Sequence, residues 1–258
     1  MKTDEIKYRK LRWFNAIMGF FHFLQGTLML VLSNDFSLPV KTSFLKFDSA
    51  TQTASPATET IYQLRIGPMI ALFLFISAVA HFSLAAPFGY TWYVKNLKKK
   101  INYARWYEYA ISSSVMIVVI AMFSGVYDIA SLILIFALNA TMNLFGLMME
   151  LHNQTTERIN WTAYVFGCFA GFVPWLVILI YFFGAISTSN VAIPTFVYFI
   201  ILTIALLFFS FAGNMFLQYK KVWKWKDYLY GETGYIVLSL VAKSALAWQV
   251  FAGTLMGG

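Results

Sequence analysis

A single lysine stands in the middle of the last apolar segment of the chain. Between Tyr235 and Leu255, Lys243 is the only charged residue, and a lysine in hydrocarbon costs about 2.5–3.5 kcal/mol even on the lenient insertion scale. Lysines near helix ends avoid this cost because their side chains reach the interface, but Lys243 lies about 12 Å from Tyr235 along a helix. A neutral, covalently occupied lysine would remove much of the cost, and that is the chemistry of a Schiff base.

Three further ionisable side chains lie within apolar segments at about the depth of Lys243. His22, His81 and Glu108 are each about 8–13 Å from the same end of the predicted bundle, counted at the helical rise per residue. Arg105 lies nearer to a helix end. Because buried charges must be paired or neutralised, we expect Glu108 to pair with a protonated Schiff base on Lys243.

Each of three predicted helices also carries a serine one turn away from its histidine, glutamate or lysine. These serines are Ser77, Ser112 and Ser239. Residues four apart share one face of a helix, so we expect a small polar network around the ionisable residues. Serines inside a membrane also serve helix packing, or bond to the carbonyl group four residues back, and this interpretation stays open.

Plainer interpretations of the ionisable residues also stay open. Histidines in a helical bundle often only pack or form hydrogen bonds, and Lys243 and Glu108 could be a purely structural ion pair. A metal site is the weaker hypothesis, because two histidines and one glutamate show no characteristic ligand spacing. The single cysteine, Cys168, excludes an intrachain disulfide and a cysteine-based metal site.

The elements that must position these residues are membrane-spanning helices. The chain is 60% hydrophobic and only 12% charged, whereas a soluble domain has about 25% charged residues. Its apolar runs do not alternate as the strands of a membrane β-barrel do, and each suits a helix that crosses about 30 Å of hydrocarbon. Seven helices are predicted, over Trp13–Leu32, Ile66–Phe88, Tyr103–Phe123, Tyr127–Met149, Trp161–Phe183, Pro194–Tyr219 and Tyr235–Leu255. The predicted fold is an all-α membrane protein, a single seven-helix domain over residues 1–258.

The loops predict the direction of the helices. Fifteen of the 19 Lys and Arg residues fall on the side of the N-terminus, three on the other side, and Lys243 lies within a helix. Positive residues mark the cytoplasm, so the N-terminus is predicted to be cytoplasmic and the C-terminus extracellular. This topology explains the net charge of +8 without a nucleic-acid partner. The longest connection, residues 33–64, is polar enough to lie in water, and its Thr, Val and Phe content permits a β-hairpin.

Several stretches of the chain are similar to those of one family of membrane proteins. They are Gly19–Gln25, Ala71–Phe82, Glu108–Val118 and, most specifically, Tyr235–Gln249. Seven helices with a lysine in the seventh and a carboxylate in the third resemble a microbial-type rhodopsin. The cytoplasmic N-terminus resembles heliorhodopsins in particular, and the resemblance covers nearly all of the chain.

The resemblance implies all-trans retinal bound covalently to Lys243, with Glu108 as the counterion. It implies a polar cluster around the Schiff base that contains Ser77, Ser239, His22 and His81. It also implies a homodimer and an external hairpin in the first loop. Ion-pumping relatives carry an aspartate one turn before the lysine, where this chain has Ser239, so only one carboxylate faces the Schiff base.

The walls of the retinal site are expected to be largely apolar and aromatic. Residues expected to touch the polyene are Met116, Asn139, Trp175 and Phe209. Isomerisation by light should turn the N–H of the Schiff base away from Glu108, so that the proton leaves. Glu108 or the His22 and His81 network would receive it, since an imidazole titrates near neutral pH.

We expect a light-sensing photoreceptor of the cell membrane, not an enzyme, that signals without net ion pumping. In the outer half, the stretches Val115–Phe123, Ser131–Asn139, Phe172–Phe183 and Ala245–Leu255 carry no Asp, Glu, His, Lys or Arg, although serines, tyrosines, Gln249 and waters could still carry a proton. A light-driven proton transporter or channel is the alternative, and a membrane scaffold or transporter without retinal is a third. The cytoplasmic partner is unknown; the basic loops are candidate docking surfaces, but membrane topology already explains them.

Overall fold

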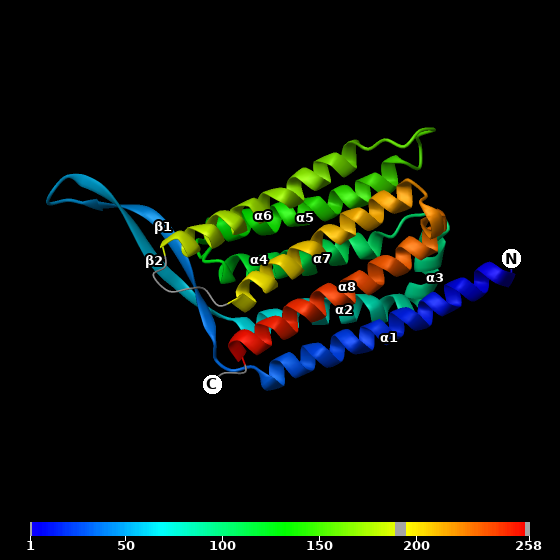
Figure 1. Cartoon of the computed structure of the whole chain (residues 1–258), viewed down its shortest axis with the longest axis horizontal. Helices are drawn as coiled ribbons and strands as arrows, with labels where there is room; N and C mark the ends of the chain where they lie inside the picture. Colours follow the sequence, from blue (N-terminus) through cyan, green and yellow to red (C-terminus); the bar gives the residue numbers. More distant parts are fainter. Residues whose placement is uncertain (1, 189–194, 256–258) are drawn as a thin grey trace.

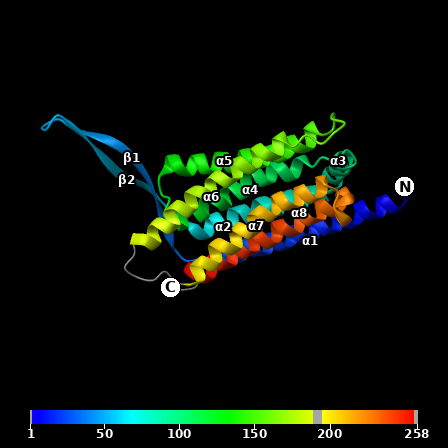
Figure 2. The ribbon, with the colours of Figure 1, turned by 45° about the horizontal axis from the view of Figure 1, so that its top comes forward.

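The computed structural model describes residues 2–188 and 195–255, and most of them are helical (Figure 1). Seven helices in these ranges are long and apolar enough to cross a membrane. They are α1 (Lys2–Leu32), α2 (Ile66–Ala85), α4 (Tyr103–Phe123), α5 (Ile129–His152), α6 (Thr162–Thr188), α7 (Thr195–Tyr219) and α8 (Tyr228–Val250). They lie side by side in one bundle (Figures 1 and 2), which confirms the predicted seven-helix membrane fold.

Most helix ends lie within a few residues of the predicted ones, and α4 agrees at both ends. The first helix begins at Lys2 rather than Trp13, because a helix can continue into water beyond its apolar stretch. The shifts at the start of α5, from Tyr127 to Ile129, and at the end of α6, from Phe183 to Thr188, are smaller. The predicted start of the sixth span, Pro194, lies outside the described residues.

The second predicted helix, Ile66–Phe88, is wrong at its end, since α2 stops at Ala85. Ala86 has an extended backbone, with φ −62° and ψ 148°, because the ring of Pro87 disfavours the helical region for the residue before it. Pro87 then starts a separate helix, α3 (Pro87–Leu97), in a position where a proline has no helical hydrogen bond to lose. This unpredicted helix brings Tyr93 into the bundle, where it is buried.

The last helix begins at Tyr228, two turns before the predicted start at Tyr235. A short 3₁₀ turn, Trp223–Lys226, precedes it. The Asp227 side chain caps the helix by accepting a hydrogen bond from the Leu229 amide at 3.0 Å. Beyond Val250 the chain continues as one π turn, Phe251–Leu255.

The connection between α1 and α2 is an antiparallel β-hairpin. Its strands are β1 (Ser37–Asp48) and β2 (Thr53–Arg65), with a bulge between Val40 and Lys41. The hairpin projects past the end of the bundle that lies opposite the N-terminus (Figure 2). At its base the Lys41 amide donates to the Tyr127 carbonyl at 2.8 Å, which ties the hairpin to the connection between α4 and α5.

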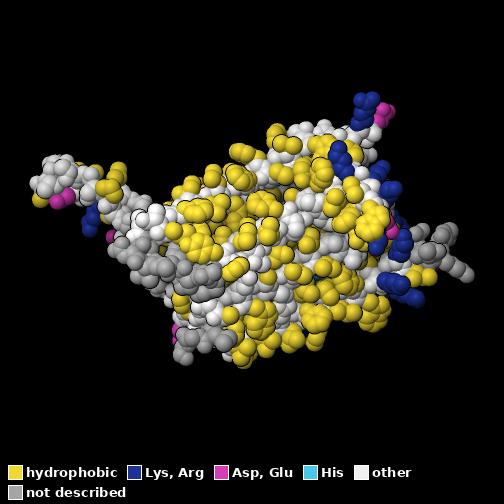
Figure 3. All heavy atoms as spheres, viewed as in Figure 1, with side chains coloured by type: hydrophobic (Ala, Val, Ile, Leu, Met, Phe, Trp, Pro, Cys, Tyr) yellow, Lys and Arg dark blue, Asp and Glu magenta, His cyan; other side chains and the backbone are white. Residues whose placement is uncertain are grey.

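The two halves of the bundle differ in their interior and at their ends. Toward the hairpin the core is apolar, with Met29, Phe73 and Val119 fully buried. From the level of Lys243 toward the N-terminus the interior also holds buried ionisable side chains. Basic side chains gather at the N-terminal end of the molecule, while apolar side chains cover the flank of the helices (Figure 3).

Candidate functional site

Lys243 and Glu108 form a buried ion pair where α8 faces α4. Lys243 Nζ lies 2.8 Å from Glu108 Oε1, and the side chains are 3% and 8% exposed. Nζ also donates to Ser239 Oγ at 3.0 Å, and the Ser77 hydroxyl donates to the same Glu108 oxygen at 2.6 Å. Hydrogen bonds to charged groups are shorter and stronger than neutral ones. Four of the predicted site residues, from three helices, are therefore in direct contact.

The third predicted serine is less directly involved. Ser112 is fully buried beside the Glu108 carboxylate, but its hydroxyl meets no hydrogen-bond geometry with any described residue. Its spacing predicted the correct helix face, and the hydrogen bond to Glu108 comes instead from Ser77 on the neighbouring helix.

The two predicted histidines stack on each other and do not contact the ion pair through a hydrogen bond. The His22 and His81 rings are 5.4 Å apart between centroids and nearly parallel, at 9°. His81 Nδ1 lies 2.7 Å from Asn15 Oδ1, whereas neither nitrogen of His22 has a partner among the described residues. His81 and Glu108 line the same small cavity. The cavity therefore lies between the histidine stack and the Glu108 carboxylate.

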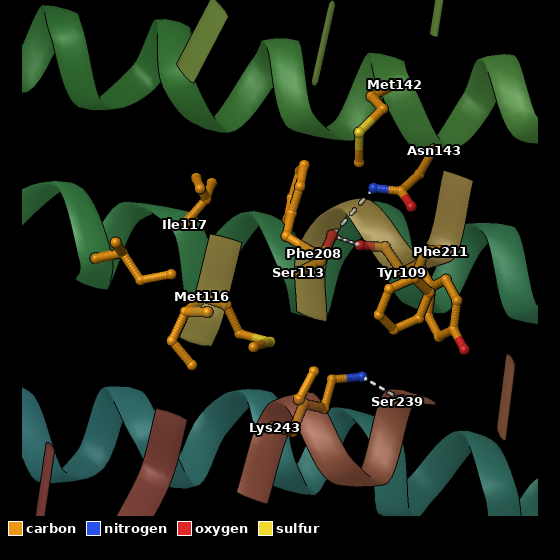
Figure 4. Close-up of a pocket in the computed structure, with 13 residues that line it drawn as sticks. Tyr109, Ser113, Met116, Ile117, Met142, Asn143, Phe208, Phe211, Ser239 and Lys243 are labelled. Carbon is orange, nitrogen blue, oxygen red and sulfur yellow. Dashed lines mark hydrogen bonds between the residues drawn. The ribbon is translucent and has the colours of Figure 1, made fainter. Parts of the chain in front are cut away.

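An apolar cavity begins at Lys243 and extends between α4, α5 and α7 (Figure 4). Its lining is mostly aliphatic and aromatic, and includes Met116, Ile117, Ile120, Met142, Ile204, Phe208 and Phe211. A second apolar cavity adjoins it, with Tyr109, Met142 and Phe208 in both walls. An apolar slot with a lysine nitrogen at its edge suits a long apolar group attached to that nitrogen.

The four residues expected to touch a polyene fall into two groups. Met116 lines the first cavity and Phe209 lines the second. Asn139 and Trp175 are buried behind the walls. Asn139 donates to Ser113 Oγ at 2.7 Å, and Trp175 packs against Phe209 with ring centroids 6.1 Å apart. These two residues hold the lining residues in place and do not line either cavity themselves.

Sequence reasoning missed part of the lining. The Tyr109 ring lies 5.2 Å from Lys243 Nζ, and Ser113 and Asn143 also line the first cavity, joined by a hydrogen bond of 3.0 Å. Helical spacing offered a signal, because Ser113 is four residues after Tyr109 and Asn143 is four after Asn139. Ser113 shares a face of α4 with Tyr109, and Asn143 shares a face of α5 with Asn139, so both could have been assigned to this site from their spacing.

A second buried ionic cluster lies between Glu108 and the N-terminal end of the bundle. We call Arg105, Glu150 and Glu232 the arginine cluster; each is at most 5% exposed. Arg105 pairs with Glu150 at 2.5 Å through one guanidinium nitrogen and with Glu232 through the other. Arg105 is among the cations expected near the cytoplasm, and the predicted helices stop just short of both glutamates. α5 and α8 extend past those predicted ends and include Glu150 and Glu232, and neighbouring helices bury all three residues.

Aromatic side chains hold the arginine cluster in place. The Arg105 guanidinium carbon lies 4.6 Å from the centre of the Trp106 ring and 4.0 Å from that of Tyr235, a favourable cation–π arrangement. The Trp106 indole donates to Glu150 at 2.7 Å. Trp106 can lie this close to α5 only because residue 146 is glycine, where an added Cβ would overlap the indole ring.

Replacing Arg105 by glutamine should lower the free energy of unfolding by about 3–5 kcal/mol, because the change removes the cation that both buried glutamates contact. Unfolding by a denaturing detergent measures this value. The exposed Arg158 offers a matched control, since Arg158→Gln should change the free energy by no more than about 0.5 kcal/mol. Equal stability of the two variants would mean that the ion pairs of Arg105 do not support the fold.

The protein family that the chain matches agrees with the geometry of this site. Residues 11–255 match the family model named Heliorhodopsin, which is almost the full chain. The chain belongs to the heliorhodopsin family. Among curated protein sequences, none matches it.

Membership confirms the resemblance drawn from the sequence. Heliorhodopsins are retinal-binding, light-sensing rhodopsins, and the family is a photoreceptor-type membrane family and not a classical enzyme family. A Schiff-base linkage is expected for the family. The residues of this heliorhodopsin fit such a chromophore, because the one buried lysine in the described ranges stands beside an apolar cavity.

Proposed function

We propose that this heliorhodopsin is a light sensor of the cell membrane that binds all-trans retinal covalently at Lys243 and signals without net ion transport. The observation that carries the proposal is the buried Lys243–Glu108 pair at the edge of an apolar cavity. When bound, retinal supplies the absorption of light and the isomerisation that follows it. Glu108 is the proposed counterion of the protonated Schiff-base nitrogen.

The side chains around Nζ divide the remaining work. In the dark, Glu108 Oε1 holds the proton at Nζ from 2.8 Å, while Ser77 and Ser239 orient the two groups through their own hydrogen bonds. In the light, the N–H at Nζ turns away from Glu108, so the proton loses its acceptor and is held less tightly. Either Glu108 or the stacked histidines then receive it, and thermal return reverses both steps.

The sensor is favoured over a proton transporter or channel by the composition of the half near the hairpin. Net transport needs groups that exchange protons on both sides of Nζ. On the hairpin side, the stretches Val115–Phe123, Ser131–Asn139, Phe172–Phe183 and Ala245–Leu255 contain no Asp, Glu, His, Lys or Arg, and the core there is apolar. A proton released at Nζ therefore finds its acceptors on one side only.

Vesicles that contain the retinal-loaded protein should show no sustained light-driven change of internal pH, because that proton returns by the path it left. A pH-sensitive dye inside the vesicles measures this, and a known proton pump in the same lipids is the control. A stationary photocurrent in the wild-type protein that disappears in Glu108→Gln would contradict the sensor hypothesis and favour a light-driven proton transporter.

The orientation and the partners belong to the same proposal. The N-terminus is cytoplasmic and the C-terminus extracellular, which is supported by the basic side chains at the N-terminal end of the molecule (Figure 3). The protein forms a homodimer, and the basic cytoplasmic loops dock the partner that receives the signal. Protease added to sealed, oriented vesicles should cut the basic loops from the cytoplasmic side alone.

A further inference from the structure

The arginine cluster plays no part in the mechanism above, and its formal charges do not balance. One guanidinium faces two carboxylates, and the three side chains are almost completely buried. If both glutamates were ionised, the cluster would bury a net negative charge, which protein interiors strongly disfavour. Two carboxylates that share a site commonly avoid this by holding one proton between them.

The hydrogen bonds indicate which glutamate holds the proton. Glu150 accepts hydrogen bonds at 2.5–3.1 Å from four donors: the backbone N–H of Asn102, the Trp106 indole, the Arg105 guanidinium and the Tyr228 hydroxyl. The first three are groups that only donate, a setting that favours an ionised carboxylate.

Glu232 has only two partners that cannot accept a hydrogen bond, the Asn102 amide nitrogen Nδ2 at 2.5 Å and Arg105. Its third partner is the Tyr93 hydroxyl at 3.0 Å. A hydroxyl can donate to an ionised Glu232 or accept a hydrogen bond from a protonated Glu232. Burial holds the pKa of Tyr93 well above its usual range, so this phenol stays neutral and available for either role.

Glu232 is also the carboxylate that faces the ion pair of Lys243. A cavity of about 30 Å³, which is enough for about two waters, lies between Glu232 and Glu108 and does not touch Glu150. Asn15 and Tyr93 form part of its wall. Asn15 bonds to His81 and interacts with Tyr93, and Tyr93 bonds to Glu232. Hydrogen-bonding groups therefore follow one another from the histidine stack to Glu232.

We propose that Glu232 is a proton-binding site, neutral in the dark, that Tyr93 and Asn15 connect to the stack of His22 and His81. The titratable or charged groups around Glu232 and the rest of the arginine cluster come from α2, α3, α4, α5, α7 and α8. They are His81 from α2, Tyr93 from α3, Arg105, Glu108 and Tyr109 from α4, Glu150 from α5, Tyr219 from α7, and Tyr228 and Tyr235 from α8. Light would change the hydrogen bonds of Glu232, and this last step alone rests on the proposed function.

Infrared spectroscopy of the retinal-free protein tests the proton site without any chromophore. At pH 7 the wild type should show a carboxylic acid C=O band that shifts in D₂O. Glu232→Gln should abolish it, and so should Glu150→Gln, because Arg105 then balances Glu232 alone. Glu108→Gln is the matched control and should keep the band. A wild type without such a band, or a band that survives in Glu232→Gln, overturns the proposal.

Tyr93→Phe distinguishes the two glutamates, because it removes one hydroxyl and keeps the buried ring. The band should change frequency if the proton is on Glu232, and an unchanged band would place it on Glu150 and overturn the assignment. In the retinal-loaded protein, the light-minus-dark spectrum should contain this band displaced. Asn15→Leu should remove that displacement while keeping the dark band of the retinal-free protein. A displacement that persists in Asn15→Leu overturns the connection, and a protein that binds no retinal overturns only the proposed function.

Discussion

Replacing Lys243 by alanine should give a protein that stays colourless when retinal is added. Lys243 is the lysine that lines the apolar cavity, and no other amine in the cavity wall can form an imine with an aldehyde there. The absorption spectrum after reconstitution should lose its entire visible band. In the wild type, illumination with hydroxylamine should bleach that band and release retinal oxime.

Two further variants separate lost attachment from lost folding. Lys243→Ala leaves Glu108 without its cation, and the pair is buried, so the single variant should also be less stable. The double variant Lys243→Ala/Glu108→Gln removes both charges and should fold while remaining colourless. Lys46→Ala, on exposed β1, should bind retinal as the wild type does. A coloured Lys243→Ala protein would contradict Lys243 as the attachment site. A wild-type protein that stays colourless with retinal would favour the third hypothesis, a membrane scaffold or transporter without retinal.

Glutamine in place of Glu108 should change the colour and still permit attachment. The amide keeps the shape of the side chain but removes the negative charge 2.8 Å from Nζ. Breaking a buried ion pair costs about 3–5 kcal/mol, so the unpaired positive charge must respond. Either it spreads along the polyene, which moves the absorption to longer wavelength, or it is lost with its proton, which moves the absorption to the near ultraviolet. Spectra recorded across a range of pH separate the two outcomes.

Ser77→Ala provides the graded comparison for Glu108→Gln. It removes one hydrogen bond to the carboxylate, worth about 1.5–3 kcal/mol for a charged acceptor, and keeps the negative charge. Its spectral shift should therefore be smaller than that of Glu108→Gln. If Glu108→Gln leaves both the spectrum and its pH dependence unchanged, Glu108 is not the counterion.

The ion pair could be predicted from the sequence because its two members share one depth and carry opposite charges. Lys243 and Glu108 lie in long apolar stretches, so the helical rise placed them at one level before any packing was known. Ser239 followed from the same reasoning, since it shares a helix face with Lys243. The hydrogen bond from Ser77 to Glu108 was harder to predict, because it joins two different helices.

The arginine cluster could not be predicted in this way. Glu150 and Glu232 stand at the ends of apolar stretches, where hydropathy cannot distinguish a buried side chain from one in water. Only the packing of α4, α5 and α8 brings both to Arg105. The same limit applies to α3, whose sequence is too polar and too short to show that Tyr93 enters the bundle.

The pocket residues show a third limit. Asn139 and Trp175 lie on helices that form the pocket, but a rotation of a few tens of degrees decides whether a side chain lines a cavity or supports its wall. Periodicity gives the face of a helix that is buried, and the small Gly146 and Gly171 then set how closely neighbouring side chains approach. Those distances follow from the complete set of contacts and from no single segment.

The apolar half of the interior makes this molecule electrically one-sided. Met29, Phe73 and Val119 belong to a core of low permittivity that no charged side chain interrupts in the described residues, and moving a bare ion through such a layer is prohibitive. A flash should therefore produce a brief displacement current confined to the half near the N-terminus, followed by an equal current of opposite sign. Until that reversal, part of the energy of the photon would be held in a rearranged dipole that faces one compartment, and the voltage across the bilayer would end where it began.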